Sequence, residues 1–451
     1  MGKLPRIKSV LEMRRAPLEY FCKLSQSSAK VVSVKLGFET VSLINHPDAV
    51  AHIFRTNQKN YIRSRIYKRL APLMGQNLFT TEGAEWQRQR QNSQPSMSGP
   101  NLKKMISQMK LGTDAAISTL QGHAETRENF SAFRFAAMTT LDIALRSFFS
   151  VTLDEKMANR IYENLSTIVE TWERRIWAIF PTPVSIPTPQ NIRFRAAVHD
   201  LRSFTGEMVA ERLKLAEQPN DLLGNLIEAE KKQSKPDLIF DLLVDQCVFI
   251  LLASHETGAE TLTWFLCMMS RFPSVGRKIA AEADRVLNSG VVDFKSVTDL
   301  TYTAQVCDEI LRLYPPAWNI SRQAVADDEI CGHTIPAGRI VMVSPYVIHR
   351  LKEFWPNPEG FEPDRFQTEN KKRQHSFAFF PFAGGKNNCL GYRFAKLESV
   401  LLFASLMQKF EFHLQPGQDL RPVPMTTLRP ASEMIMEVVA RSTRQSRNIA
   451  A

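Results

Sequence analysis

The most extended hydrophobic pattern in the chain covers Asp237–Phe272, where apolar side chains occur on nearly every face of a helical projection. Pro236 and Pro273 flank this segment, and proline does not fit inside a helix. At about 1.5 Å per residue, such a helix is roughly 54 Å long. A helix that is apolar on all sides is buried, so we expect it to run through the middle of a large α-rich body. Four ionisable residues argue against a transmembrane helix: Asp245, His255, Glu256 and Glu260.

A β-hairpin is predicted near the N-terminus. Residues 31–44 alternate between apolar and polar positions on both sides of Gly37, which indicates two short strands, and a helix is expected after Pro47. Helical periodicity then dominates from about Gly83 to Arg271. Two interruptions indicate loops between helices rather than domain linkers. They are Gln94–Asn101 and the prolines Pro181, Pro183, Pro187 and Pro189.

Strand-like patterns replace helical ones after Pro315-Pro316. Strands are expected within residues 319–332 and 338–349, and again near Phe410–Leu414 and Met434–Val438.

These patterns together predict a mainly α fold with small β-sheets, organised as one domain over residues 1–451. The residues 442–451 are expected to be disordered. The expected β-rich portions lie near 31–55, 320–350 and 410–440, and the helical body covers about 83–315 and 390–409.

Charge and cysteine usage narrow the class of protein. Lys+Arg 57 and Asp+Glu 46 give a formal net charge of +11, which is not concentrated in a basic arm. This argues against nucleic-acid binding and favours an acidic partner or an anionic substrate. The six cysteines are scattered without a CxxC pair, as expected in a reducing compartment. Because the N-terminus lacks the apolar run of a signal peptide, we expect a soluble, cytoplasmic protein with no membrane span.

The segment FFPFAGGKNNCLGYRFAKLE, residues 379–398, surrounds Cys389 with glycine, phenylalanine and basic charge. Gly385 and Gly391 let the backbone approach a flat ligand and point amide N–H groups at a sulfur atom. Phe382 is placed to cover that sulfur, and the dipole of the helix that follows favours a thiolate. A lone cysteine is more often an inert core residue, but the full spacing Phe-x-x-Gly-x-x-x-Cys-x-Gly is too demanding for that interpretation.

The motif FAGGKNNCLG, residues 382–391, resembles the haem-binding signature of cytochromes P450. The resemblance implies the cytochrome P450 fold, with a b-type haem between the long central helix and the cysteine loop and helix. It implies that the Cys389 thiolate is the axial ligand of the iron. It also places neighbouring residues at the cofactor: Phe382, Gly385, Asn387, Gly391 and Ala395.

Glu309 and Arg312, in the sequence EILR, lie one helical turn apart. Alone they would indicate an ordinary surface ion pair. Their position ahead of FEPDRF, residues 361–366, resembles the Glu-x-x-Arg helix of the family. The resemblance adds Arg365 and implies a buried charge network that supports the loop on the haem side and takes no part in catalysis.

Trp86 and Arg90, in EWQRQRQ, resemble the family's Trp-x-x-x-Arg helix, whose side chains reach the haem propionates. Arg322 fits the arginine that reaches them from a strand. Without the cysteine motif, Trp86 and Arg90 would indicate a core aromatic and a solvated charge. Asn387 stands where the family typically has Arg or His on a propionate, so Arg90, Arg322 and Trp86 are expected to carry more of the anchoring.

The sequence ASHET, Ala253–Thr257, lies inside the long helix and places polar side chains among apolar ones, which is costly without a reason. A polar stripe facing a loop is one interpretation. The segment also resembles the family's kink over the distal haem face, where Ala253 lies at the cofactor. The resemblance implies that Glu256 and Thr257 relay protons to iron-bound dioxygen. Ser254 departs mildly from the family pattern, which has glycine there.

The resemblance implies a haem-thiolate monooxygenase that uses O₂ and electrons from outside, because no flavin, dinucleotide or iron–sulfur motif is found. We expect an acidic ferredoxin or flavodoxin with an NAD(P)H-dependent reductase. The expected docking face is basic and consists of Arg88, Lys386, Arg393 and Lys396.

The substrate is expected to be a lipophilic small molecule of secondary metabolism: a fatty acid, a terpenoid or a polyketide-like metabolite. The overall likeness is to bacterial relatives of long-chain fatty-acid hydroxylases, and a monomer is expected. The alternatives are an oxidase that couples or desaturates its substrate, a peroxide-driven enzyme, and a non-catalytic haem sensor. The expected pocket walls are Tyr67–Phe79, Trp172–Ile192, Ala253 and Thr257, Ala317–Ser321 and Met425–Thr427.

Overall fold

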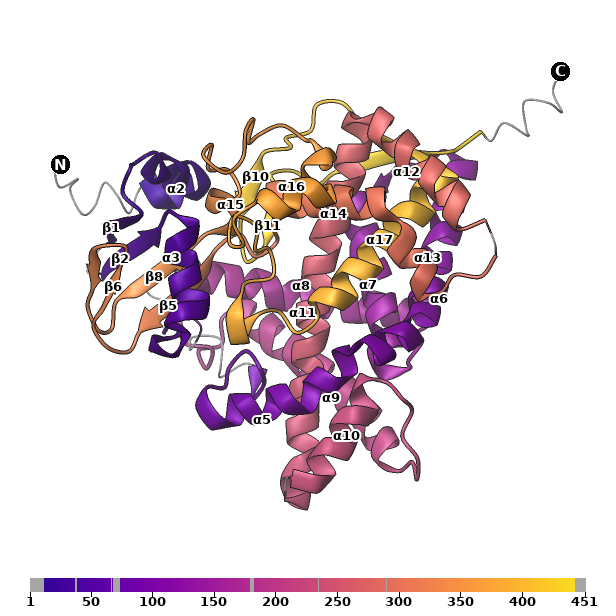
Figure 1. Cartoon of the computed structure of the whole chain (residues 1–451). Coiled ribbons are helices and arrows are strands. Elements are labelled where there is room, and N and C mark those ends of the chain that lie inside the picture. The colour runs from indigo at the N-terminus through magenta and orange to yellow at the C-terminus, as the bar shows by residue number, and fades with distance from the viewer. Residues whose placement is uncertain are drawn as a thin grey trace.

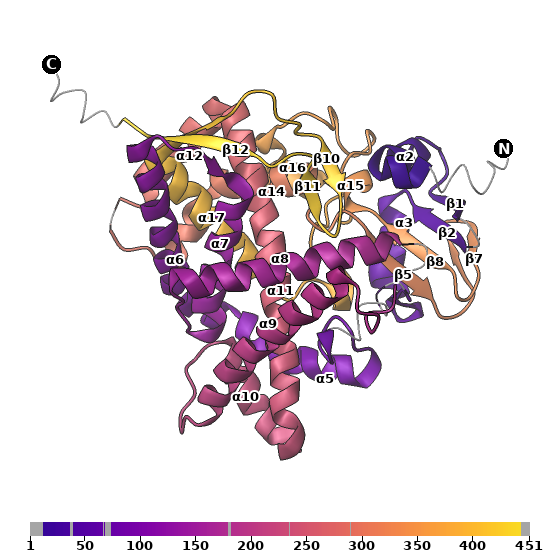
Figure 2. The same cartoon turned by 180° about the vertical axis from the view of Figure 1, so that it is seen from behind.

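The fold is organised around one helix, α11 (Pro236–Arg271). The computed structural model describes residues 12–36, 39–65, 67, 74–178, 182–233, 235–288 and 290–442. Figures 1 and 2 show α11 crossing the middle of the molecule. The predicted central helix is confirmed, shifted by one residue at each end. Aromatic stacking fixes its C-terminal half, since Trp264 lies 3.8 Å from Tyr314 and Phe265 lies 3.7 Å from Phe403 between ring centroids.

Among the described residues, one helix is long and apolar enough to cross a membrane, and it is this same α11, over Asp237–Arg271. Of its most apolar window, 61% is buried inside the protein. It packs against α7 (Ala132–Ala144), α9 (Pro189–Leu213) and α17 (Tyr392–Lys409). The apolar composition of α11 is therefore explained by its position as the core helix of the helical body.

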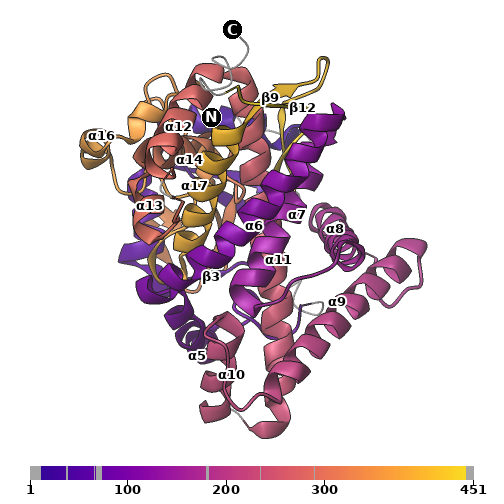
Figure 3. The ribbon, with the colours of Figure 1, turned by 90° about the vertical axis from the view of Figure 1, so that its right-hand side faces the viewer.

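Helices form most of the remaining body and surround α11 (Figure 3). Among the described residues, the other helices of nine residues or more are α2 (Pro17–Ser25), α5 (Gly83–Ser93), α6 (Gly99–Thr126), α8 (Glu155–Trp177), α10 (Leu222–Gln233), α12 (Pro273–Val286) and α14 (Thr301–Leu313). The shorter helices and helical turns are α3 (Pro47–Ala51), η1 (His52–Thr56), η2 (Gln58–Asn60), η4 (Gln94–Met97), η5 (Leu145–Phe149), α13 (Phe294–Asp299), α15 (Pro345–Ile348), η6 (Pro363–Phe366), α16 (Thr368–Arg373) and η7 (Gly385–Asn387).

The largest sheet within the described residues has the strand order β1-β2-β8-β5-β3. The predicted N-terminal hairpin is confirmed as β1 and β2, and its turn at Gly37 lies outside the described residues. Strand β2 pairs in parallel with β8, so the first strands of the chain join a sheet completed much later in the sequence. The strands of this sheet are β1 (Val31–Leu36), β2 (Glu39–Ile44), β3 (Tyr61–Arg63), β5 (Ile320–Ala324) and β8 (Ile340–Val343).

Smaller sheets lie beside the helical body. The predicted strands near residues 410 and 435 are confirmed, and they pair antiparallel with Met436 opposite Leu414. The hairpin of β10 and β11 falls inside the β-rich portion expected over 410–440. The strands are β4 (Phe130–Ser131), β6 (Asp328–Ile330), β7 (His333–Ile335), β9 (Phe410–Leu414), β10 (Pro422–Pro424), β11 (Leu428–Pro430) and β12 (Ile435–Ala440).

One predicted strand is partly wrong. The structure ends β8 at Val343 and turns Pro345–Ile348 into the short helix α15. The Ser344 hydroxyl accepts a hydrogen bond from the Val347 N–H at 3.3 Å, and proline occupies the first helical position. A serine cap followed by proline is a helix-start signal, which outweighs the β-propensity of the valine and isoleucine that follow. The expected disorder after residue 442 falls outside the described residues.

The predicted Glu309–Arg312–Arg365 network is confirmed and buried. Glu309 and Arg312 are both 0% exposed, and their side chains meet at 2.6 Å. Arg365 approaches Glu309 at 3.4 Å. Arg312 also donates to the carbonyl oxygens of Pro358 and Gly360 at 2.6 and 2.9 Å, which fixes the chain that leads toward the cysteine loop. Burial and these backbone contacts distinguish the pair from a surface salt bridge.

Glu309→Ala should lower the free energy of unfolding by about 3–5 kcal/mol, because it leaves the buried Arg312 guanidinium without its carboxylate. Urea unfolding followed by circular dichroism measures this loss. Asp299→Ala is the control: it removes the carboxylate of the exposed Lys295–Asp299 pair and should cause no measurable change. Equal losses in the two variants would contradict the structural role of Glu309.

Candidate active site

The loop that carries Cys389 is held by backbone contacts. The Cys389 N–H donates to the Phe382 carbonyl oxygen at 2.9 Å, which closes the loop before α17 begins. The Gly391 N–H points at the Cys389 sulfur. The side chain of Cys389 is exposed, whereas Ala395, one turn into α17, is half-buried. The predicted arrangement of an accessible sulfur facing a backbone amide is therefore present in this loop.

Solvent reaches part of the Cys389 side chain, but many protein atoms lie around its thiol. This surrounding protein raises the pKa of the thiol above its ordinary value. The Gly391 N–H and the Arg90 guanidinium act in the opposite direction. The sequence favoured a thiolate through the dipole of α17, and the net direction in the protein alone is the reverse. A coordinating metal deprotonates a thiol outright, so the thiolate at this position depends on the metal.

Gly385 and Gly391 are glycines for different reasons. A Cβ on Gly385 would lie 1.7 Å from the Phe54 carbonyl oxygen, and the backbone φ of +66° is in the left-handed region. The close approach at Gly385 is therefore to the protein itself, and a haem contact for Gly385 stays a prediction. A Cβ on Gly391 meets no atom within 4 Å. The side of Gly391 is consequently open to a ligand.

Arg90 connects α5 to the cysteine loop. Its guanidinium donates to the Asn388 carbonyl oxygen at 2.9 Å and to the Asn388 Oδ1 at 2.7 Å. Trp86, one turn earlier on α5, is buried. The sequence placed both side chains at propionates, which stays a prediction; the structure brings Arg90 to the cysteine loop. It adds Asn388 as a partner of Arg90, while Asn387 is half-buried one residue earlier.

Arg322 is a buried cation without a carboxylate partner in the described part of the chain. Its guanidinium donates to the Ser321 carbonyl oxygen at 3.0 Å and lies 5.6 Å from the centre of the Phe54 ring. Burial lowers the pKa of Arg322. A buried guanidinium without a counter-ion is energetically unfavourable. A haem propionate would supply that counter-ion.

Arg63 is a second arginine at this position, and the sequence analysis missed it. Strand β3 pairs with β5 so that Arg63 lies directly opposite Arg322. Arg63 also lies 6.0 Å from the Trp86 ring. Unlike Arg322, Arg63 finds several hydrogen-bond acceptors in the protein: its guanidinium donates to the Leu78 and Thr81 carbonyl oxygens at 2.8 and 3.0 Å. The proximity of Arg63 to Arg322 follows only from the register of β3 and β5.

Two residues of α11 form an accessible surface that we term the distal face: Ala253 and Thr257. Both are exposed, although the residue before each of them, Leu252 and Glu256, is buried. The Thr257 hydroxyl donates to the Ala253 carbonyl oxygen at 2.9 Å, and Ser254 makes the same kind of bond to Ile250 at 2.7 Å. Both hydroxyls therefore find a hydrogen-bond partner within α11, which continues as a helix through this segment.

Glu256 lies next to Thr257 in sequence, but its carboxylate is engaged elsewhere. It is buried and accepts hydrogen bonds from Thr427 at 2.9 Å and from Arg429. Both partners lie at the β10–β11 hairpin, which sequence analysis named only as a pocket wall. Arg429 is a further residue that the sequence did not reveal, because its role depends on the hairpin reaching α11. The proton-relay roles of Glu256 and Thr257 stay predictions.

Arg429 holds two more acids besides Glu256. Glu260 lies 3.0 Å from the Arg429 Nε, and Glu173 lies 3.7 Å from its Nη2. Burial raises the pKa of Glu260 well above the ordinary range and also raises that of Glu173. Three buried carboxyls therefore share one cation, and at Glu173 and Glu260 burial favours the protonated form.

The residues present fit a haem with a thiolate ligand. The fit rests on the accessible Cys389 sulfur beside α17, the open side of Gly391, the buried unpaired Arg322 and the accessible distal face of α11, a helix that packs against α17. The metal ligand would be Cys389, and the propionates would take Arg322, with Arg90 and Trp86 beside them.

Comparison with known proteins agrees with this geometry. The family model described as cytochrome P450 matches residues 1–438. The chain belongs to the cytochrome P450 family. Membership implies a haem-thiolate cofactor, and with its relatives it identifies the chain as a cytochrome P450 monooxygenase.

Bacterial oxygenases are among the relatives of this cytochrome P450. Cyclooctat-9-en-7-ol 5-monooxygenase from Streptomyces melanosporofaciens is 29% identical over 95% of this chain and 90% of the relative. Pentalenene oxygenase from Streptomyces avermitilis is 26% identical over 98% of this chain and 97% of the relative. The solved structure of retinoic acid bound cyanobacterial CYP120A1 is 22% identical, with a TM-score of 0.83 and coverage of 97% and 98% of the two chains. This last likeness confirms the predicted fold.

The predicted pocket walls of this cytochrome P450 partly come together. The Trp318 indole N–H donates to the Met425 carbonyl oxygen at 2.9 Å, which joins two of the predicted segments. The Ser321 N–H reaches the Tyr67 hydroxyl at 3.4 Å, which joins a third. Residues 68–73 of the Tyr67–Phe79 segment lie outside the described residues.

The expected basic docking face is smaller than predicted. Arg88 pairs with Glu230 at 2.6 Å, and Lys396 pairs with Asp308 at 2.7 Å. Their charges are therefore compensated inside the protein, which net charge along a sequence does not show. The two exposed members that remain are Lys386 and Arg393.

A buried acid on α17, Glu398, was also missed. A Cβ on Gly258 would lie 3.8 Å from the Glu398 Oε2, and Thr140 of α7 lies at the same contact. Burial alone raises the pKa of Glu398 to about 8. The carboxyl is therefore largely protonated at neutral pH, next to the helical turn that carries Thr257. The sequence feature that could have indicated Glu398 is an acidic residue on an otherwise apolar face of the helix.

Glu398→Gln should change the pH dependence of stability. Because the folded protein binds this proton more tightly than the unfolded chain, Glu398 costs stability as pH rises from about 4.5 to about 8, by at most about 1.4 kcal/mol per pH unit. The glutamine variant should therefore gain free energy of unfolding relative to the native sequence at pH 8 and show a smaller gain at pH 5. Urea unfolding at both pH values tests this, and an equal difference at the two would contradict it.

Proposed function

We propose that this protein is a haem b monooxygenase that oxidises a lipophilic terpenoid with O₂ and two externally supplied electrons. The observation that carries the proposal is the accessible Cys389 sulfur, held by the Phe382 carbonyl and faced by the Gly391 amide. The overall reaction is RH + O₂ + 2e⁻ + 2H⁺ → ROH + H₂O. When bound, the haem supplies the activation of O₂, and thiolate ligation favours O–O cleavage.

The residues of the chain contribute positioning and proton transfer. The distal face of α11 would bound the haem-binding space, where the exposed Thr257 would act as proton donor. Glu256 is held by Arg429 and Thr427, so it must leave the Arg429 contact to exchange a proton with Thr257. Glu173 and Glu260, which share Arg429 with Glu256, support this role, because burial favours their protonated forms.

The substrate class rests on relatives and on the pocket walls. Two relatives are named for oxidising cyclooctat-9-en-7-ol and pentalenene. Trp318, Met425 and the half-buried Phe79 provide apolar surface where the predicted wall segments meet. A largely apolar terpenoid suits such walls better than a strongly charged molecule. We infer a role in secondary metabolism, and a cytoplasmic location and a monomeric state stay predictions.

An acidic ferredoxin or flavodoxin with an NAD(P)H-dependent reductase is the electron source that we infer. Lys386 lies three residues before Cys389, and Arg393 lies four residues after it, so both exposed cations flank the proximal ligand. Their charges complement an acidic partner. Arg88 and Lys396 are excluded from this surface because carboxylates of the chain already compensate them.

Cys389→Ser should remove the red-shifted Soret band that the reduced, carbon-monoxide-bound protein is expected to show, since that band depends on thiolate ligation. The measurement is a difference spectrum of the purified protein reduced under carbon monoxide. The matched control is Cys331→Ser, which changes the other exposed cysteine and should leave the band intact. Retention of the band in Cys389→Ser would falsify the assignment of the metal ligand.

Thr257→Ala should divert electrons into hydrogen peroxide while haem binding is kept, because O₂ activation then lacks the accessible hydroxyl. The test measures peroxide formed per NAD(P)H consumed, with the terpenoid from a panel that shifts the haem band most. Thr257→Ser keeps the hydroxyl and should restore coupling. Unchanged peroxide in Thr257→Ala would remove this residue from the mechanism.

A further inference from the structure

Glu230 is a buried carboxylate near the end of α10. It is 2% exposed, and both of its oxygens accept hydrogen bonds from α5. The Arg88 guanidinium donates to Oε2 at 2.6 Å, and the Asn92 amide donates to Oε1 at 3.0 Å. These two donors lie one helical turn apart, and Figure 3 shows α5 and α10 side by side. Glu230 therefore holds one face of α5 against α10.

The opposite face of α5 contacts the cysteine loop. With 3.6 residues per turn, Arg90 lies about 160° around the helix axis from both Arg88 and Asn92. Trp86, one turn before Arg90, shares the face of Arg90. The Arg90 guanidinium donates to the carbonyl oxygen and the Oδ1 of Asn388 at 2.9 and 2.7 Å. One face of α5 is thus joined to α10, and the other face reaches the residue that directly precedes the candidate metal ligand.

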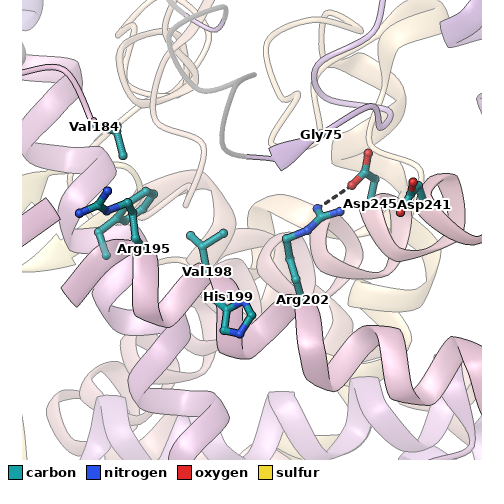
Figure 4. A pocket seen from close by; sticks show the side chains of 9 residues that line it. Gly75, Val184, Arg195, Val198, His199, Arg202, Asp241 and Asp245 are labelled. Atoms are coloured by element: carbon teal, nitrogen blue, oxygen red, sulfur yellow. Dashed lines mark hydrogen bonds and ion pairs between the residues drawn. The ribbon is translucent and has the colours of Figure 1, made fainter. Parts of the chain in front are cut away.

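The segment that precedes α5 is fixed separately, by α11. Figure 4 shows the Arg202 guanidinium directed at the Asp245 carboxylate of α11, and the two side chains pair at 2.6 Å. The other oxygen of Asp245 accepts from the Gln76 N–H at 2.7 Å. The Gln76 carbonyl oxygen in turn accepts from the Gln89 side chain of α5 at 3.4 Å. The approach to α5 therefore has its own anchor, whereas Glu230 anchors the helix itself.

The charge of Arg88 is already compensated within α5. Glu85, one turn earlier, accepts from the Arg88 Nε and Nη2 at 2.9 and 2.8 Å. A buried carboxylate is costly unless it is paired and hydrogen-bonded, and such groups can fix the register of packed helices. Because Arg88 has Glu85 as a partner in its own helix, the contribution specific to Glu230 is the link between α5 and α10.

We propose that Glu230 is a positioning residue for the thiolate ligand. By fixing α5 against α10, it holds Arg90 at Asn388 and keeps the cysteine loop in the geometry that a metal ligand needs. Glu230 acts through α5 and not by contact with the haem. The inference rests on the proposed function, since it takes Cys389 to be the haem ligand.

The first experiment measures the rate of haem transfer from the holoprotein to an apo-globin acceptor. Glu230→Ala should speed haem loss about tenfold, because contacts that orient a metal ligand typically contribute at least this much to affinity. Glu230→Gln keeps one acceptor oxygen and should give a smaller increase. The matched control is Glu228→Ala, which removes an exposed carboxylate of the same helix that lies 3.9 Å from Lys231. If Glu230→Ala loses haem as slowly as Glu228→Ala, the proposal is overturned.

A second control separates positioning from stability. Glu282 is a buried carboxylate of α12, which lies at the other end of the molecule from α5 (Figures 1 and 3). It accepts from the Thr303 N–H and hydroxyl at 2.9 and 2.7 Å. Glu282→Gln should lower the free energy of unfolding in urea and leave haem loss at the native rate. If haem loss instead follows the lost stability equally in Glu282→Gln and Glu230→Ala, Glu230 is only structural and the proposal is overturned.

The second experiment is a double-mutant cycle with Asn388→Ala, which removes the side-chain acceptor of Arg90. Each single substitution should speed haem loss. The double variant should lose haem no more than about twofold faster than Asn388→Ala alone, because Glu230 acts through the contact that Asn388→Ala already weakens. Fully additive effects would show that Glu230 does not act through Arg90 and Asn388, and they would overturn the proposal.

The two hypotheses fail in distinguishable ways. Absence of haem or of the red-shifted carbon monoxide band from the native sequence would overturn the proposed function and this inference with it. A native protein that has both, with haem loss insensitive to Glu230, would overturn the positioning role alone. Hydrogen exchange gives a readout that needs no haem acceptor. The Cys389 amide, which donates to the Phe382 carbonyl oxygen, should exchange faster in Glu230→Ala and at the native rate in Glu228→Ala. Native exchange in both variants would contradict the proposal.

Discussion

The proposed site depends on holding one short loop still, because a Cys389 sulfur that serves as a metal ligand needs a fixed position. The loop contributes little packing of its own and is fixed by its surroundings. The Phe382 carbonyl closes it, Arg90 fastens Asn388 from α5, and the Phe54 carbonyl occupies the place where Gly385 would carry a side chain. Metal centres need such outer contacts to orient their ligands. Several elements that are distant in sequence are thus devoted to one thiol.

Buried charge is handled in two opposite ways in this protein. Around Glu309 each charge is met by an opposite charge and by backbone carbonyls, which suits a structural support. Around Arg429 the carboxyls outnumber the cation, and burial raises the pKa values of Glu173 and Glu260. The first cluster resists change, whereas the second can take up or release protons. This contrast distinguishes a structural charge cluster from one whose protonation can change.

The sequence predicts those features whose cause is local. The central helix was located to within one residue because prolines bound it, and the cysteine loop was located because its residue spacing is demanding. The positions of Arg63, Asn388 and Arg429 were not predictable, since each depends on a strand register or on a contact between distant elements. For the same reason, the sequence did not show that carboxylates distant along the chain compensate the charges of Arg88 and Lys396. The error at Pro345–Ile348 arose where a capping serine outweighed β-propensity.

The parallel pairing of β2 with β8 has a consequence for how the protein is made. Val41 pairs with Ile340, and Phe130 of β4 pairs with Met436 of β12. The first sheet cannot be completed until Val343 has left the ribosome, and the second cannot be completed until Ala440 has. Until then the inner edge of β2 presents unpaired backbone groups that could pair with another chain. Contacts between such distant residues also slow folding, so newly synthesised chains have a prolonged requirement for protection from aggregation.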